Sequence, residues 1–188
     1  MLFRSAVKAL AQPTKQAWVY VLNRETGEPV WPIEERPVPK GDVPGEWYSP
    51  TQPYVTKPPA YDAQGLSVND LIDWTPALRE EALKRVARYK LGPIFTPPVV
   101  SKIEGPLATL ALAATSGGTN WQGGSYDPET HILYAPSQRS ISPYGLVPPE
   151  PGTSEFNFVQ GSALTGARRS GGAGAEAGAD RPGGTPAA

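Results

Sequence analysis

The stretch TSGGTNWQGGSYDPETHILYAP, residues Thr115–Pro136, joins a glycine-rich polar run to two short apolar segments that flank an Asp-Pro-Glu-Thr sequence. Because Asp-Pro favours turn initiation, this stretch predicts a strand, a turn and a second strand. The glycine-rich run also contains an amide, Asn120, and an indole, Trp121, which a turn alone does not require. Glycines allow a close backbone approach, so the pattern favours a flat ligand lying against this backbone.

A weaker copy of this unit lies near the start of the chain. The segments NRETGEPVW, residues 23–31, and DPETHILYA, residues 127–135, share a polar-x-x-Thr frame. The run Ala17–Asn23 is aromatic and β-branched and predicts a strand before the first copy, and a short strand ending on Trp31 is expected after it. Repeated strand–turn–strand units are typical of a propeller or a similar array.

Composition excludes several classes of function. The chain has 188 residues, 23 prolines, 20 glycines, no cysteine and a formal net charge of −1. The near-neutral charge and the lack of a basic stripe argue against nucleic acid as a partner. Without cysteine there is neither a disulfide nor a thiolate metal site. No apolar run is long enough to span a membrane, and the first 15 residues show no signal peptide.

The rest of the chain divides into four kinds of segment. Residues 32–65 form a proline-rich excursion without regular structure, whose aromatic residues favour order over disorder. Residues 75–91 predict a helix, with Thr75 as N-cap and a solvated charged face. Pro106–Thr115 predicts a buried strand, although its Ala and Leu content also allows a helix. Residues 162–188 are expected to be a disordered Gly/Ala-rich tail after a structured region, 1–161.

Four stretches resemble the pyrroloquinoline quinone (PQQ)-dependent dehydrogenases, closest to the glucose dehydrogenase branch of the quinoproteins. They span roughly residues 8 to 161 and contain QPTKQAWVYVLNRETGEPVWPIEERPVPKGDVPGEWYSPTQPY, DLIDWTPALREEALKRVARYKLGPIFTPP, GGTNWQGGSYDPETHILYAPS and EFNFVQG. The resemblance implies an all-β fold with a helical insertion, forming two to three blades of an eight-bladed quinoprotein β-propeller. Each blade of that family is a four-stranded antiparallel sheet.

In that family a tryptophan from a repeated Asp-x-x-Thr-Gly-x-x-x-Trp motif wedges between neighbouring blades. Asn23, Thr26, Gly27 and Trp31 fit this motif, with Asn in place of Asp. In the second copy His131 replaces the glycine and Ala135 replaces the tryptophan, which puts blade docking there in doubt. Such an arc leaves blade edges open, so the chain by itself is expected to be marginally stable.

The resemblance assigns roles to three residues. Lys15 stands where the family places a Lys or Arg against the quinone oxygens, so it is the candidate catalytic and cofactor-binding residue. Asn120 and Trp121 match an Asn-Trp pair near the cofactor and are the other candidate cofactor-binding residues. The alternatives are an exposed lysine before a strand, a tryptophan that fills the core between blades, and an asparagine that serves a turn. No metal ligand is assigned in this chain.

Further residues receive secondary roles. Thr14 and Gln16 are expected to orient Lys15, and three residues of the excursion are expected to line a substrate funnel. His131 is interpreted as a surface residue and Asp127 as a turn residue. The funnel residues are Trp47, Tyr48 and Gln52.

The resemblance implies a piece of a dehydrogenase that oxidises a sugar or alcohol by hydride transfer to PQQ. Its partners would be that substrate and ubiquinone or a cytochrome as electron acceptor, in the periplasm or at the periplasmic face of the inner membrane. The family's calcium ligands and catalytic Asp lie upstream of Lys15, so the chain alone is expected to be inactive. The alternative is a propeller-derived segment that serves as a non-catalytic binding module or scaffold.

Overall fold

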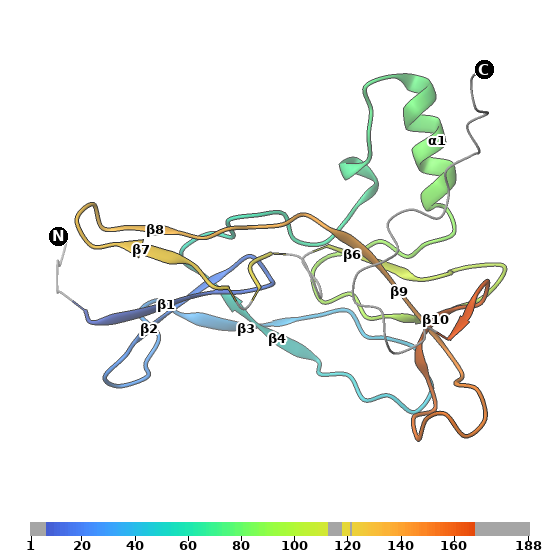
Figure 1. Ribbon diagram of the computed structural model, residues 1–188, viewed down its shortest axis with the longest axis horizontal. Coiled ribbons are helices and arrows are strands. Elements are labelled where there is room, and N and C mark those ends of the chain that lie inside the picture. Colours follow the sequence, from blue (N-terminus) through green and yellow to red (C-terminus); the bar gives the residue numbers. More distant parts are fainter. Residues whose placement is uncertain (1–6, 113–117, 121, 168–188) are drawn as a thin grey trace, which may run out of the picture.

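The computed structural model describes residues 7–112, 118–120 and 122–167 (Figure 1). Within them the chain consists mostly of short strands with one α-helix. This confirms the predicted all-β class with a helical insertion, and it is consistent with a β-propeller domain. The described strands form three two-stranded sheets and one five-stranded sheet. The number of blades stays a prediction.

The first hairpin pairs β1 (Ala9–Pro13) with β2 (Val19–Asn23) in antiparallel register. The strand predicted over Ala17–Asn23 is therefore confirmed but begins at Val19, because Ala17 adopts a left-handed conformation with φ 62°. The strand β1 was not predicted. At the turn the chain enters the core, where Trp18 is 3% exposed.

The proline-rich excursion contains regular structure, which corrects the prediction that it has none. The strands β3 (Ile33–Pro37) and β4 (Thr51–Val55) pair as an antiparallel ribbon. Prolines fit here because both strands of a two-stranded ribbon are edges, where a missing N–H leaves no ladder bond unmade. The short strand expected before it is only an isolated bridge between Leu22 and Pro29.

Three aromatic rings join these two hairpins to the loop at residues 92–96. The ring centroids of Trp18 and Tyr54 lie 5.0 Å apart, and Phe95 lies 6.0 Å from Trp18 and 5.7 Å from Tyr54. Such tilted and edge-on pairs contribute beyond their buried area. This cluster fixes the β1–β2 hairpin on the rest of the molecule.

The largest sheet is built around the long strand β9 (Ile141–Val147). Two strands, β6 and β10, pair with β9 in antiparallel fashion and β5 pairs with it in parallel, while β11 lies beyond β10. Within the predicted segment Pro106–Thr115, the strand β6 confirms the strand alternative for Thr109–Leu112, while residues 113–115 lie outside the described residues. The other members are β5 (Val99–Val100), β6 (Thr109–Leu112), β10 (Val159–Ser162) and β11 (Gly166–Ala167).

The predicted tail begins later than residue 162. Residues 162–167 complete β10 and form β11, which returns on β10 with Ser162 opposite Gly166. The expected disorder was wrong for these residues because backbone pairing, rather than apolar side chains, holds them. The remainder, 168–188, lies outside the described residues.

The opening stretch of the sequence forms the predicted hairpin, with β7 (Ser125–Asp127) antiparallel to β8 (Ile132–Tyr134). The hairpin is largely exposed, since Tyr126 and Tyr134 retain 58% and 55% of their surface. Figure 1 shows it as an arm extending away from the five-stranded sheet.

The helix α1 (Pro76–Val86) projects from the body of the molecule, preceded by a short 3₁₀ turn, η1 (Val68–Asp70) (Figure 1). Thr75 caps it as predicted, because its Oγ1 accepts a hydrogen bond from the Leu78 N–H at 3.2 Å. The helix ends at Val86 instead of residue 91, and none of its residues is buried. The described part of the chain contains no helix with the length and apolarity to cross a membrane.

Candidate functional site

Lys15 lies at the tip of the β1–β2 hairpin, in the turn formed by residues 14–18. The turn is closed by two backbone hydrogen bonds, Thr14 N–H to Trp18 O at 2.9 Å and Ala17 N–H to Thr14 O at 3.0 Å. The Lys15 side chain is exposed. Among the described residues no carboxylate makes an ion pair with it, so its ammonium group is available to an anionic ligand.

A second segment, residues 61–64, runs along this turn and is called the strap. The Tyr61 N–H donates to Ala17 O at 3.0 Å, and Gln64 Nε2 donates to Gln16 O at 2.5 Å. Gln16 therefore contributes its backbone carbonyl to this contact, and its predicted role in orienting Lys15 stays a prediction. The strap holds the turn from a region of the chain that follows the second hairpin.

The segment 118–120, which begins the Asn120 region, packs backbone to backbone on the Lys15 turn. The Thr119 N–H donates to Thr14 O at 3.3 Å. A Cβ atom at Gly118 would lie 2.2 Å from Lys15 O, and Gly118 has φ +61°. Only glycine allows both this conformation and this approach. Three segments that are far apart in the sequence, residues 14–18, 61–64 and 118–120, therefore meet at one place, which is called the junction.

Three hydroxyl contacts tie the junction together. Tyr61 Oη lies 2.9 Å from Thr14 O and 2.7 Å from Thr119 Oγ1, and Thr119 Oγ1 in turn donates to Pro136 O. Thr119 is 2% exposed, so its hydroxyl depends on these protein partners. Thr14 contributes mainly its carbonyl, which accepts from Ala17, Tyr61 and Thr119.

The carboxylate of Asp62 anchors the strap to a further segment of the chain. The Asp62 carboxylate accepts hydrogen bonds from Ser137 Oγ and Arg139 Nε, and its side chain is only 11% exposed. These two hydrogen bonds, the serine first and the arginine second, hold the pKa of Asp62 below its ordinary value. Asp62 therefore links the strap to the chain between β8 and β9.

The structure places the three predicted ligand residues as follows. Lys15 and the segment bearing Asn120 meet at the junction. Asn120 is half-buried, and its backbone carbonyl accepts the Gly123 N–H at 3.0 Å in a tight turn. Trp121 lies outside the described residues. The proximity of the Lys15 and Asn120 segments could not be read from spacing.

The predicted funnel residues lie in a different part of the molecule. Trp47 is 81% exposed, and the Tyr48 hydroxyl accepts the Val43 N–H within its own loop at 3.3 Å. Gln52 pairs with Arg36 in the β3–β4 ribbon. No hydrogen bond or ring contact among the described residues connects them to the Lys15 turn.

The turn residues behave as predicted. His131 is exposed, and its Nδ1 lies 2.8 Å from the Tyr126 hydroxyl. Asp127 caps its own turn by accepting from the Glu129 N–H at 2.9 Å and from Thr130 Oγ1 at 2.5 Å. These bonds, with Thr130 first, lower the pKa of Asp127.

Tyr61 is the residue of the junction that the sequence did not single out. Its aromatic ring in the proline-rich excursion indicated order there, but nothing in the pattern linked it to the residues at 14 and 119. Those partners are distant in the sequence, so only the folded chain reveals the role of its hydroxyl.

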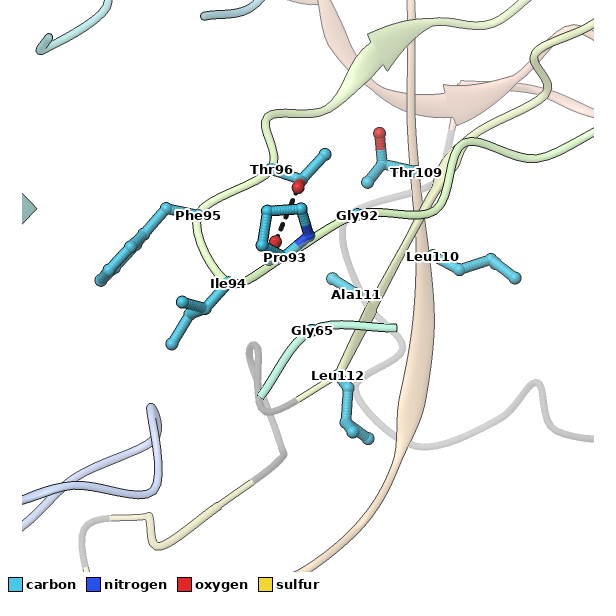
Figure 2. Close-up of a pocket in the computed structure, with 10 residues that line it drawn as sticks. All are labelled: Gly65, Gly92, Pro93, Ile94, Phe95, Thr96, Thr109, Leu110, Ala111 and Leu112. Carbon is cyan, nitrogen blue, oxygen red and sulfur yellow. Dashed lines mark hydrogen bonds between the residues drawn. The ribbon is translucent and has the colours of Figure 1, made fainter. Parts of the chain in front are cut away.

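Two small hollows lie in the described part of the chain, away from Lys15 and Asn120. The first, of about 30 Å³, corresponds to roughly one water molecule. Figure 2 shows it beside the loop where Thr96 Oγ1 donates to Pro93 O at 2.6 Å. The second, of about 210 Å³, lies by the strap and is lined by Ala63, Leu66, Asp70, Leu112, Arg139 and Ile141.

Neither hollow reaches the roughly 300 Å³ at which pockets for small organic ligands begin. Within the residues that the structure describes, no three histidine or acidic side chains gather closely enough to hold a metal ion.

Comparison with known proteins gives a consistent result. Residues 4–181 match the family described as PQQ: glucose/ethanol/alcohol dehydrogenase, beta-propeller domain. The chain is 39% identical over 132 residues to the glycerol dehydrogenase large subunit of Gluconobacter oxydans (strain 621H), a match over 69% of this chain and 17% of that protein. No solved structure matches the chain significantly.

Two further relatives carry different substrate names. A probable quinate dehydrogenase (quinone) of Xanthomonas campestris pv. juglandis is 31% identical over 137 residues, 72% of this chain and 16% of the relative. The quinoprotein glucose dehydrogenase of Escherichia coli (strain K12) is 29% identical over 150 residues, 78% of this chain and 18% of the relative. The chain thus spans only about one sixth of the length of these relatives.

Proposed function

Since the chain belongs to the PQQ-dependent glucose/ethanol/alcohol dehydrogenase β-propeller family, we propose that it supplies part of the cofactor surface of such a dehydrogenase. The complete enzyme would oxidise a sugar or another alcohol and pass the electrons to ubiquinone or a cytochrome. The relatives named for glycerol, quinate and glucose, one of them with quinone in its name, support this class of substrate and acceptor.

One observation carries the proposal: the Lys15 turn and the segment bearing Asn120 form one junction. Thr119 N–H bonds Thr14 O, and the Gly118 backbone lies against that of Lys15. Sequence resemblance alone assigned these two residues to the same ligand. In the folded chain their backbones meet, which supports a shared ligand.

The donor chemistry of the junction fits PQQ. The exposed Lys15 ammonium, which has no ion-pair partner among the described residues, and a side-chain amide donate hydrogen bonds. The carboxylates and quinone oxygens of the cofactor accept them. When bound, PQQ supplies the ortho-quinone that accepts a hydride from the substrate. Lys15 would orient it and stabilise negative charge on its oxygens, Asn120 would bond its polar edge and Trp121 would line the pocket.

The other parts of the proposal concern the complete dehydrogenase. It would be an eight-bladed propeller of which this chain forms two to three blades, located in the periplasm or at the periplasmic face of the inner membrane. Calcium would accompany PQQ on ligands outside the three residues assigned here. Because the chain spans about one sixth of its relatives, we expect no turnover from the chain alone.

Titration of the chain with PQQ, followed by quenching of tryptophan fluorescence, tests the cofactor surface. We expect saturable quenching that Lys15→Ala weakens about tenfold or more, because a charge-assisted contact is lost. Lys102→Ala is the matched control, since Lys102 is likewise exposed but lies in another loop. Its affinity should stay within twofold of that of the unaltered chain.

The absence of quenching, or equal affinity in both variants, would contradict the proposal and favour the non-catalytic scaffold alternative. A dye-reduction assay with PQQ, calcium and glucose or glycerol tests the expected inactivity. Turnover by the isolated chain would overturn that part alone.

A further inference from the structure

We propose that the Tyr61 hydroxyl is a positioning group that holds the Lys15 turn and the Asn120 segment together as two halves of one site. This inference rests on the proposed function for its consequence in cofactor binding. Tyr61 Oη contacts Thr14 O at 2.9 Å and Thr119 Oγ1 at 2.7 Å. Each of these residues is the immediate neighbour of a predicted ligand residue.

The hydroxyl network has more contacts than protons, so at most two of its three contacts are hydrogen bonds at any moment. Three oxygen–oxygen contacts, Tyr61 to Thr14, Tyr61 to Thr119 and Thr119 to Pro136, share the two protons of the Tyr61 and Thr119 hydroxyls. Each hydroxyl has only one proton to donate. Removing the phenolic oxygen therefore leaves one proton and a single oxygen–oxygen contact.

The position of Tyr61 is itself fixed from both sides. Its N–H bonds Ala17 O at 3.0 Å, and the next residue, Asp62, is held by Ser137 and Arg139. The ring therefore reaches the junction from an anchored backbone. Loss of the hydroxyl leaves these anchors intact and loosens the contact between the two segments. Binding that needs both segments at one distance should weaken when that contact loosens.

Tyr61→Phe tests the inference, and Tyr54→Phe is its matched control. Tyr54 lies in the aromatic cluster, and among the described residues its hydroxyl makes no hydrogen bond. Two measurements are made on the full chain, amide hydrogen exchange by NMR without cofactor and affinity for PQQ by fluorescence quenching.

In Tyr61→Phe the amides of Ala17 and Thr119, which both donate to Thr14 O, should exchange about three- to tenfold faster. Amides of the β7–β8 hairpin should change less than twofold. The affinity for PQQ should fall by a similar three- to tenfold. In Tyr54→Phe both quantities should stay within twofold, whereas a general loss of stability would speed exchange in the hairpin as well.

Unchanged exchange at Ala17 and Thr119 would overturn the inference, as would faster exchange spread evenly over the chain. If PQQ binds the unaltered chain and Tyr61→Phe loosens the junction without weakening that binding, the positioning role is also wrong. If PQQ does not bind the unaltered chain, the proposed function fails and the exchange measurement alone decides whether Tyr61 holds the two segments together.

Discussion

Two hairpin turns of this chain use the same strained conformation and are held in place by different means. Ala17 in the β1–β2 turn has φ 62°, and His131 in the β7–β8 turn has φ 59°. Ala17 is fully buried, and its turn is held by residues 61, 64 and 119. His131 is exposed, and its turn is held by its own side chains, Asp127, Thr130 and Tyr126.

This difference has consequences for both prediction and function. A turn held by its own residues is encoded by the local sequence. A turn held by distant segments depends on the whole fold, and the candidate ligand residues gather at that second kind of turn. Substitutions at matched positions can measure how far the two turns differ.

The largest expected effect is at Gly118, the residue packed against the Lys15 turn. Gly118→Ala places a Cβ atom 2.2 Å from Lys15 O in a left-handed conformation, so the two segments must separate. Gly123→Ala is the control, because Gly123 has φ +65° and a Cβ atom there meets nothing within 4 Å. We expect the control to cost about 1–2 kcal/mol and Gly118→Ala roughly 3–5 kcal/mol of unfolding free energy.

Urea unfolding of both variants measures this difference. Equal losses would mean that the close approach of Gly118 to the Lys15 turn contributes nothing to stability.

The sequence predicted best what is encoded locally. The Asp127 turn, the Thr75 cap and the strand after Trp18 follow from side chains that act on their own neighbours. The sequence also predicted Lys15 and Asn120 as ligand residues by resemblance, which remains a prediction. It did not predict the β3–β4 ribbon, because a high proline content usually argues against strands. Both strands of this ribbon are edge strands, where proline is tolerated.

Three other features escaped prediction for a related reason. The strand β1 lacks β-branched residues, and β11 is a Gly-Ala pair with no apolar signal; both exist because of the strand opposite them. The role of Tyr61 depends on partners at positions 14 and 119. Interactions that join distant segments leave no periodic pattern in a single sequence.

A smaller effect is expected from acidification, and it separates Asp62 of the strap from Asp127 of the local turn. Hydrogen bonds lower the pKa of both carboxyl groups in the folded chain. Each therefore contributes stability that is present above the ordinary pKa of about 3.9 and lost as the pH falls through the folded value. Asp62→Asn keeps the shape but removes the charge opposite Arg139.

Urea unfolding between pH 7 and pH 2.5 checks this expectation. The difference in unfolding free energy between the unaltered chain and Asp62→Asn should be full above about pH 4 and should shrink below it. Asp127→Asn should show the same trend with a smaller amplitude, because no cation among the described residues pairs with its carboxylate. A difference for Asp62→Asn that is independent of pH would show that its charge does not stabilise the strap.

The smallest expected effect compares the two left-handed residues directly. Replacement by glycine relieves backbone strain of about 1–2 kcal/mol and costs about 0.5–1 kcal/mol in chain entropy at either position. His131→Gly loses the exposed contact with the Tyr126 hydroxyl, which offsets part of the relieved strain, so we expect it to raise stability by about 0.5 kcal/mol, or roughly 1–2 °C in Tm. Ala17→Gly also removes a fully buried methyl group, whose burial contributes about 0.8 kcal/mol to stability. We therefore expect the Tm of this variant to fall or to stay the same. Calorimetry that finds the same rise for both variants would show that the burial of Ala17 does not distinguish the turns.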